Sequence, residues 1–99
     1  MKLELYEKQL LRSISDLVVY NPVAAYDLFE KAGESPIIDR IKNIKTFLVN
    51  NKERLPRNLS ETMQHEQYVD ELRIAIDSIE DKEVQKIFKS SLTTTEAHT

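Results

Sequence analysis

The chain has 99 residues, a net charge of −3, one glycine and no cysteine. This length is enough for one domain with a modest core. A single glycine argues against a turn-rich β-fold, and the absence of cysteine excludes a disulfide framework. We find no run of about 20 apolar residues and no secretory-signal pattern, so we expect no membrane span and a cytoplasmic location.

Two helices are expected before residue 34. The first spans residues 2–20 and carries apolar side chains at helical spacing, which we expect to face the core: Leu3, Tyr6, Leu10, Ile14 and Leu17, with Leu11 and Val18 widening the face. The second begins at Asn21-Pro22, where a capping side chain precedes a proline. Gly33 can end it in the left-handed conformation.

The stretch from Ser35 to Pro56 is predicted to be one central helix. Ser35 can cap its start, Pro36 fits the first turn and Pro56 ends it. Its apolar stripe consists of Ile37, Ile41, Ile44 and Leu48, flanked by Ile38, Phe47 and Val49. These residues cover an arc of roughly 200°, so we expect several neighbouring helices to enclose this one.

A fourth helix is predicted from Leu59, with Asn58 and Glu61 as a capping pair. Its inward residues are Val69, Leu72, Ile76 and Ile79. The apolar register slips before Val84, which predicts a break near Asp81 and a short fifth helix to about Ser90; the alternative is one continuous helix with a rotated last stretch. Residues 91–99 show no periodic spacing of apolar residues and are predicted to be a flexible tail. The expected fold is therefore all-α, an antiparallel four-helix bundle over residues 1–90.

The sequence offers little for catalysis or metal binding. His65-Glu66 resembles the start of a helical zinc motif, but Val69 stands where the second histidine would be. A chain with one glycine also lacks a phosphate-cradling loop and a glycine-bearing nucleophile turn. We therefore expect no metal, no cofactor and no enzymatic activity.

Basic residues gather between residues 40 and 58, and acidic residues between 59 and 83. The basic segment contains five candidates for phosphate contacts: Lys42, Lys45, Lys52, Arg54 and Arg57. One hypothesis is thus a small phage or plasmid regulator that binds nucleic acid or a transcription partner. The other interpretation is charge complementarity between the third and fourth helices. The chain is expected to be a monomer or a homodimer, in which Leu28 or Phe29 would pack across a two-fold axis.

The segment from Ile37 to Leu48, followed by Asn51-Lys52 and Leu55-Pro56, resembles the third helix and exit turn of the class IIa bacteriocin immunity proteins, the enterocin A immunity group. Leu5-Tyr6 in the first helix is also similar. The resemblance implies a four-helix bundle in the producer's cytoplasm that protects the cell from its own pore-forming peptide. The implied partner is a membrane-embedded sugar-transporter receptor, recognised through the C-terminal part. The contact candidates there are Ile87, Phe88, Lys89 and Leu92; the alternative for Ile87 and Phe88 is that they belong to the core.

Overall fold

The computed structural model describes the backbone of residues 3–97 and the side chains of residues 3–93. Within that part the chain forms seven α-helices and no strand, which confirms the all-α prediction. The helices are α1 (Leu5–Tyr20), α2 (Pro22–Ala32), α3 (Pro36–Asp39), α4 (Lys42–Asn50), α5 (Leu59–Gln64), α6 (Glu66–Asp77) and α7 (Lys82–Ala97), with a 3-10 turn, η1 (Lys52–Arg54), after α4.

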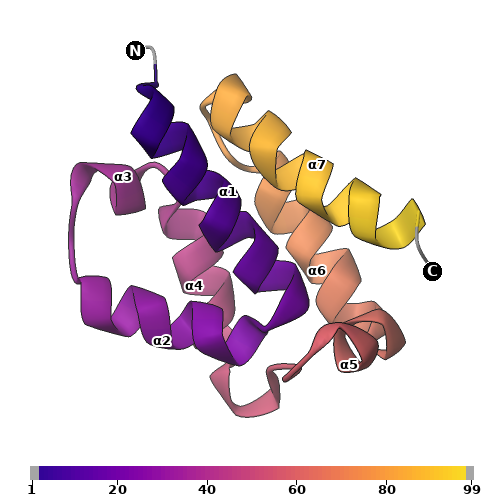
Figure 1. Ribbon diagram of the computed structural model, residues 1–99. Coiled ribbons are helices and arrows are strands. Elements are labelled where there is room, and N and C mark those ends of the chain that lie inside the picture. The colour runs from indigo at the N-terminus through magenta and orange to yellow at the C-terminus, as the bar shows by residue number, and fades with distance from the viewer. Residues whose placement is uncertain (1–2, 98–99) are drawn as a thin grey trace.

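The first and last helices lie side by side and run in the same direction (Figure 1). Lys8 is near Glu83, with 3.9 Å between nitrogen and oxygen, and the hydroxyl groups of Ser15 and Ser91 are 2.7 Å apart. Residue numbers therefore rise together along both helices. This pair differs from the antiparallel neighbours we predicted. The reason is that α6 runs back toward the N-terminal end of α1, so that α7 starts beside that end and follows α1 (Figure 1).

The buried face of α1 is rotated from the predicted one. Leu11, Ile14 and Val18 are fully buried, whereas Tyr6 and Leu10 are exposed, so the prediction was wrong for those two. Leu3 is buried but precedes the helix, so its side chain does not follow the helical period. Counting Leu3 as the first turn of the helix displaced the predicted stripe.

The predicted bounds of α2 are close to the observed ones. The Asn21 side chain accepts a hydrogen bond from the Ala24 backbone N–H at 3.1 Å, and Pro22 occupies the first turn. Gly33 follows with a φ of 65°, a conformation that glycine adopts readily. Phe29 is buried in the core, so it is not available for the contact across a two-fold axis that we considered.

The central helix is not continuous, and our prediction of one rod from Ser35 to Pro56 was wrong. The chain leaves the helical conformation at Ile41, where φ is −123° and ψ is 29°. Short-range hydrogen bonds bridge this turn, from Arg40 N–H to the Ile37 carbonyl and from Ile41 N–H to the Ile38 carbonyl. The break does not expose the apolar stripe, because Ile41 remains fully buried.

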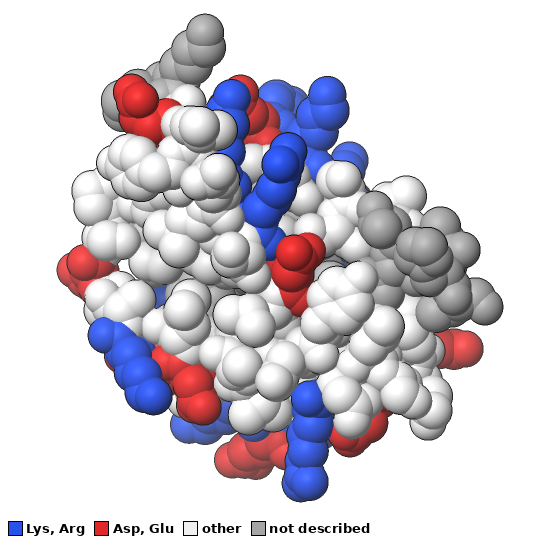
Figure 2. All heavy atoms as spheres, in the orientation of Figure 1, with Lys and Arg blue, Asp and Glu red and all other residues white. Residues whose placement is uncertain are grey.

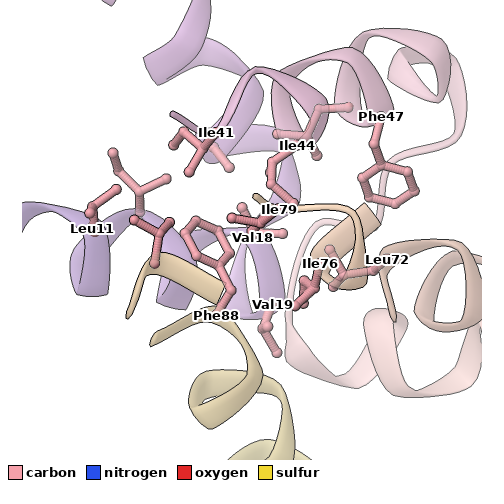
Figure 3. Close-up of a cluster of buried hydrophobic side chains, with 14 of the residues drawn as sticks. Leu11, Val18, Val19, Ile41, Ile44, Phe47, Leu72, Ile76, Ile79 and Phe88 are labelled. Atoms are coloured by element: carbon pink, nitrogen blue, oxygen red, sulfur yellow. The ribbon is translucent and has the colours of Figure 1, made fainter. Parts of the chain in front are cut away.

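The core lies between α1, α4, α6 and α7, whose apolar side chains point into a common interior (Figure 3). Ile44 and Leu48 are fully buried there, as predicted, and α4 packs against both α2 and α6. Val49 is 37% exposed, so the enclosed arc of α4 is narrower than expected.

The region after Pro56 contains two breaks. The first, at His65, was not predicted; the second, between α6 and α7, confirms the predicted break near Asp81. The buried amide of Gln85 donates to the carbonyls of Ile76 and Asp77, which satisfies the end of α6. The last helix is longer than the predicted short segment, because it continues through Ser90 to Ala97.

Candidate binding groove

The C-terminal contact candidates have different positions in the structure. Phe88 and Leu92 are only 1% and 4% exposed and belong to the core, so they are not available as surface contacts. Lys89 is exposed and forms an ion pair with Asp77 at 3.2 Å. Ile87 is half-buried and lines a groove between α1 and α7. Of the four C-terminal candidates, Ile87 is thus the one that we place in a surface depression.

This groove has a volume of about 460 Å³ and is open to solvent. Its α1 wall consists of Lys8, Arg12, Asp16 and Tyr20, and its α7 wall includes Glu83, Lys86, Ile87 and Ser91. Lys and Arg side chains gather between the N-terminal parts of these two helices (Figure 2). We call this depression the α1–α7 groove.

The two walls are held together by polar contacts. The hydroxyl of Ser15, which is buried, lies beside that of Ser91, and Ser91 also donates a hydrogen bond to an Asp16 carboxylate oxygen at 3.0 Å. Lys8 and Glu83 form a longer and more exposed ion pair toward the other end. These contacts fix the distance between the helices, so the groove is present before any partner binds.

The groove is locally basic although the chain is acidic overall. Neither Arg12 on α1 nor Lys86 on α7 has an ion pair among the residues that the structure describes. The Asp16 carboxylate accepts from Ser91 and that of Glu83 faces Lys8. The guanidinium group of Arg12 and the ammonium group of Lys86, on opposite walls, therefore face solvent.

The basic candidates from residues 42–57 do not share one site. Lys42 lines a groove of about 310 Å³ together with Asp39, Glu80 and Asp81, whose carboxylates offset its charge. Arg54 lies beyond the other end of α4 and donates to the Asn51 side chain at 3.4 Å. Lys45 is half-buried and Arg57 is exposed. Between the predicted basic and acidic segments, Arg40 forms an ion pair with Asp81 at 3.5 Å.

His65 and Tyr68 have structural contacts. The imidazole Nδ1 of His65 accepts from the Tyr68 backbone N–H at 3.1 Å and so caps α6. The Tyr68 hydroxyl donates to the Val18 carbonyl at 2.7 Å, and burial raises the pKa of Tyr68 above its ordinary value. In the described part of the chain, no group of three or more His, Cys, Asp or Glu side chains is placed to hold a metal ion.

Comparison of the chain with models of protein families, with curated proteins and with solved structures found no match. Across residues 3–97, none of the helices combines the length and the apolar composition needed to cross a lipid bilayer.

Our sequence analysis missed the α1 wall of the groove. Lys8, Arg12, Asp16 and Tyr20 are four residues apart, so they form one stripe along the helix. That spacing was visible in the sequence and marked a polar stripe. The identity of the opposite wall was not visible, because α7 follows α1 by more than 60 residues.

Proposed function

We propose that this chain is a non-enzymatic protein-binding protein, and specifically a bacteriocin immunity protein that acts in the cytoplasm of the producing cell. The observation that supports this most is the α1–α7 groove, because one wall of it is the C-terminal helix. The immunity proteins that the sequence resembles recognise their target through that part of the chain. Ile87 would contact an apolar side chain of the target, and the surrounding polar side chains would orient the target through hydrogen bonds and ion pairs.

The lining of the groove suits binding better than catalysis. Ser91 and Ser15 are hydrogen-bonded to each other, and none of the groove residues is a histidine or a cysteine. A hydroxyl nucleophile needs a neighbouring base to activate it. The nearest described carboxylate, Asp16, instead accepts the Ser91 hydroxyl in a contact that joins two helices.

The proposal is tested by expressing the chain in a sensitive Gram-positive host and challenging the cells with a panel of pediocin-like peptides. We expect protection against at least one peptide. Ile87→Arg should remove protection, whereas Ile74→Arg should retain it, because Ile74 is 68% exposed on α6 and lies outside the groove. Circular dichroism of both variants checks that the fold is intact. Sensitivity to every peptide would overturn the immunity function.

Deletion of residues 91–99 would be a poor test, although these residues were predicted to form a tail. Leu92 is buried, so its removal would leave a void in the core and destabilise the whole protein. Single substitutions at the groove surface separate recognition from stability.

The alternative, a regulator that binds nucleic acid, predicts a different result. Its binding to duplex DNA would weaken steeply as salt is raised, because phosphate contacts release counterions. Substitution of both Lys42→Glu and Lys45→Glu would abolish it. The carboxylates beside Lys42 oppose this alternative, since they repel a phosphate backbone.

A further inference from the structure

We propose that the α1–α7 groove binds an acidic segment of a partner protein and seats one apolar side chain of that segment against Ile87 and Tyr20. This inference rests on the proposed protein-binding function and adds the chemistry of the bound segment. It assigns the contact surface to both helices and not to the C-terminal helix alone.

The charges of the groove select an acidic segment. Arg12 and Lys86 stand on opposite walls, and within the described residues neither has an ion pair to neutralise it. The lining holds three cations, those of Lys8, Arg12 and Lys86, against the two carboxylates of Asp16 and Glu83. Glu83 is paired with Lys8, whereas Asp16 accepts from the uncharged hydroxyl of Ser91. A carboxylate placed between the walls would therefore meet two cations, and arginine can bind it with two parallel hydrogen bonds.

The apolar part of the lining selects a peptide over a nucleic acid. Ile87 is half-buried at the groove and Tyr20 is 41% exposed, so both offer apolar surface to a ligand side chain. The carboxylates of Asp16 and Glu83 lie in the same groove, where a continuous phosphate backbone would approach them. A peptide can place a carboxylate at the cations and an apolar side chain at Ile87, and so avoids that repulsion.

The groove is also preorganised for such a segment. The contacts of Ser15 and Asp16 with Ser91 hold the helices at a fixed spacing. Binding then does not require the walls to become ordered, which lowers its entropic cost. A volume of about 460 Å³ holds a few side chains, in the range of sites that enclose a small ligand. We therefore expect recognition of a short segment and not of a large surface.

The test uses the full chain and a fluorescein-labelled synthetic peptide, Glu-Glu-Leu-Glu-Phe-Glu-Glu, titrated by fluorescence anisotropy at low and physiological salt. Two control peptides replace every Glu by Gln, or replace Leu and Phe by Ser. We expect the original peptide to bind at least about tenfold more tightly than either control and to weaken as salt is raised.

The protein variants separate the groove from the general charge of the surface. Arg12→Gln combined with Lys86→Gln should weaken binding by about tenfold or more. The matched control, Lys31→Gln combined with Arg57→Gln, removes the same charge from exposed positions outside the groove and should leave binding unchanged. All four side chains are exposed, so we expect unchanged melting temperatures.

Three results would overturn the inference: equal binding of the Glu and Gln peptides, equal binding by the two double variants, or displacement of the peptide by a DNA oligonucleotide of the same concentration. Failure of the inference is distinguishable from failure of the proposed function. Peptide binding at the groove without protection of cells would remove the immunity function and keep the groove chemistry. Protection that survives Arg12→Gln combined with Lys86→Gln would support the immunity function and contradict the proposed role of the groove.

Discussion

The outer pair of helices and the middle of the chain bury apolar side chains in different ways. Helices α1 and α7 have 16 residues each and are uninterrupted. Between Pro36 and Asp77 the chain forms four shorter helices and a 3-10 turn. Both regions contribute fully buried residues, such as Leu11 from α1 and Ile44 from α4. Continuous helices are therefore not required for complete burial in this protein.

The difference lies in the number of helix ends whose backbone groups must be satisfied. In the middle region, the side chains of Ser35, Asn58 and His65 accept hydrogen bonds at the starts of α3, α5 and α6. The Gln85 side chain of α7 donates to the end of α6. The two outer helices have fewer ends, and side chains also cap their starts: Glu7 accepts from the Glu4 backbone N–H at α1, and Asp81 accepts from the Glu83 backbone N–H at α7. The middle region therefore depends on more capping contacts, and recognition is expected at the outer pair.

The largest expected effect tests the core of the middle region. Ile44→Ala removes a fully buried side chain of α4 and should lower the free energy of unfolding by about 2–5 kcal/mol. Ile74→Ala makes the same change at a side chain that is 68% exposed and should cost no more than about 0.5 kcal/mol. Urea denaturation measures both. Equal losses would contradict the burial described for α4.

The next effect tests the hydrogen bond that joins α6 to α1. Tyr68→Phe leaves the Val18 carbonyl without its partner and should cost about 1–2 kcal/mol, whereas Tyr6→Phe on the exposed face of α1 should be neutral. Thermal denaturation of both variants measures the difference. A neutral Tyr68→Phe would show that the Val18 carbonyl finds another donor when the hydroxyl is removed.

The same tyrosine predicts a loss of stability at high pH. Burial raises the pKa of Tyr68 in the folded protein, while the unfolded chain titrates near the ordinary value of about 10. The folded state therefore holds the proton more tightly above pH 10, and ionisation favours the unfolded state. The contribution of protonated Tyr68 to the free energy of unfolding is therefore fully present below pH 10 and is lost as the pH rises further. Tyr68→Phe should remove most of this dependence in denaturation curves recorded from pH 8 to 11.

A smaller effect tests the helix caps of the middle region. Asn58→Ala removes the acceptor of the Glu61 backbone N–H and should cost about 1 kcal/mol. Asn50→Ala, at an exposed position in the last turn of α4, should change stability little. Both are measured by urea denaturation. A loss at Asn50 equal to that at Asn58 would mean that capping is not the cause.

The smallest effect compares two ion pairs. Lys8→Gln breaks the exposed pair with Glu83 at the groove and should cost no more than about 0.5 kcal/mol. Arg40→Gln breaks the less exposed pair with Asp81 in the middle region and should cost roughly 1 kcal/mol. Guanidinium chloride would mask both, so urea at low salt is the suitable denaturant. A larger loss at Lys8 would reverse the comparison between the two regions.

Local signals predicted a good part of the fold. Asn21-Pro22 and Gly33 bounded α2 correctly, since a cap, a proline and a left-handed glycine act over a few residues. The break near Asp81 followed from the slip in apolar register before Val84. The break at Ile41 was missed because the helical spacing of apolar residues continues across it. The break at His65 was missed because the first residues of the predicted fourth helix are mostly polar, so they have no apolar period that a break would interrupt.

The amino-acid sequence by itself determined that the chain is helical, where several helices begin, and that α1 carries a stripe of polar residues four positions apart. Helical period and capping are local properties, so neighbouring residues are sufficient to specify them. Only the tertiary structure decided that α7 runs parallel to α1 and turns that stripe into a groove. Ser15 and Ser91 meet because the links of the whole chain bring two distant helices together, and no local pattern contains that information.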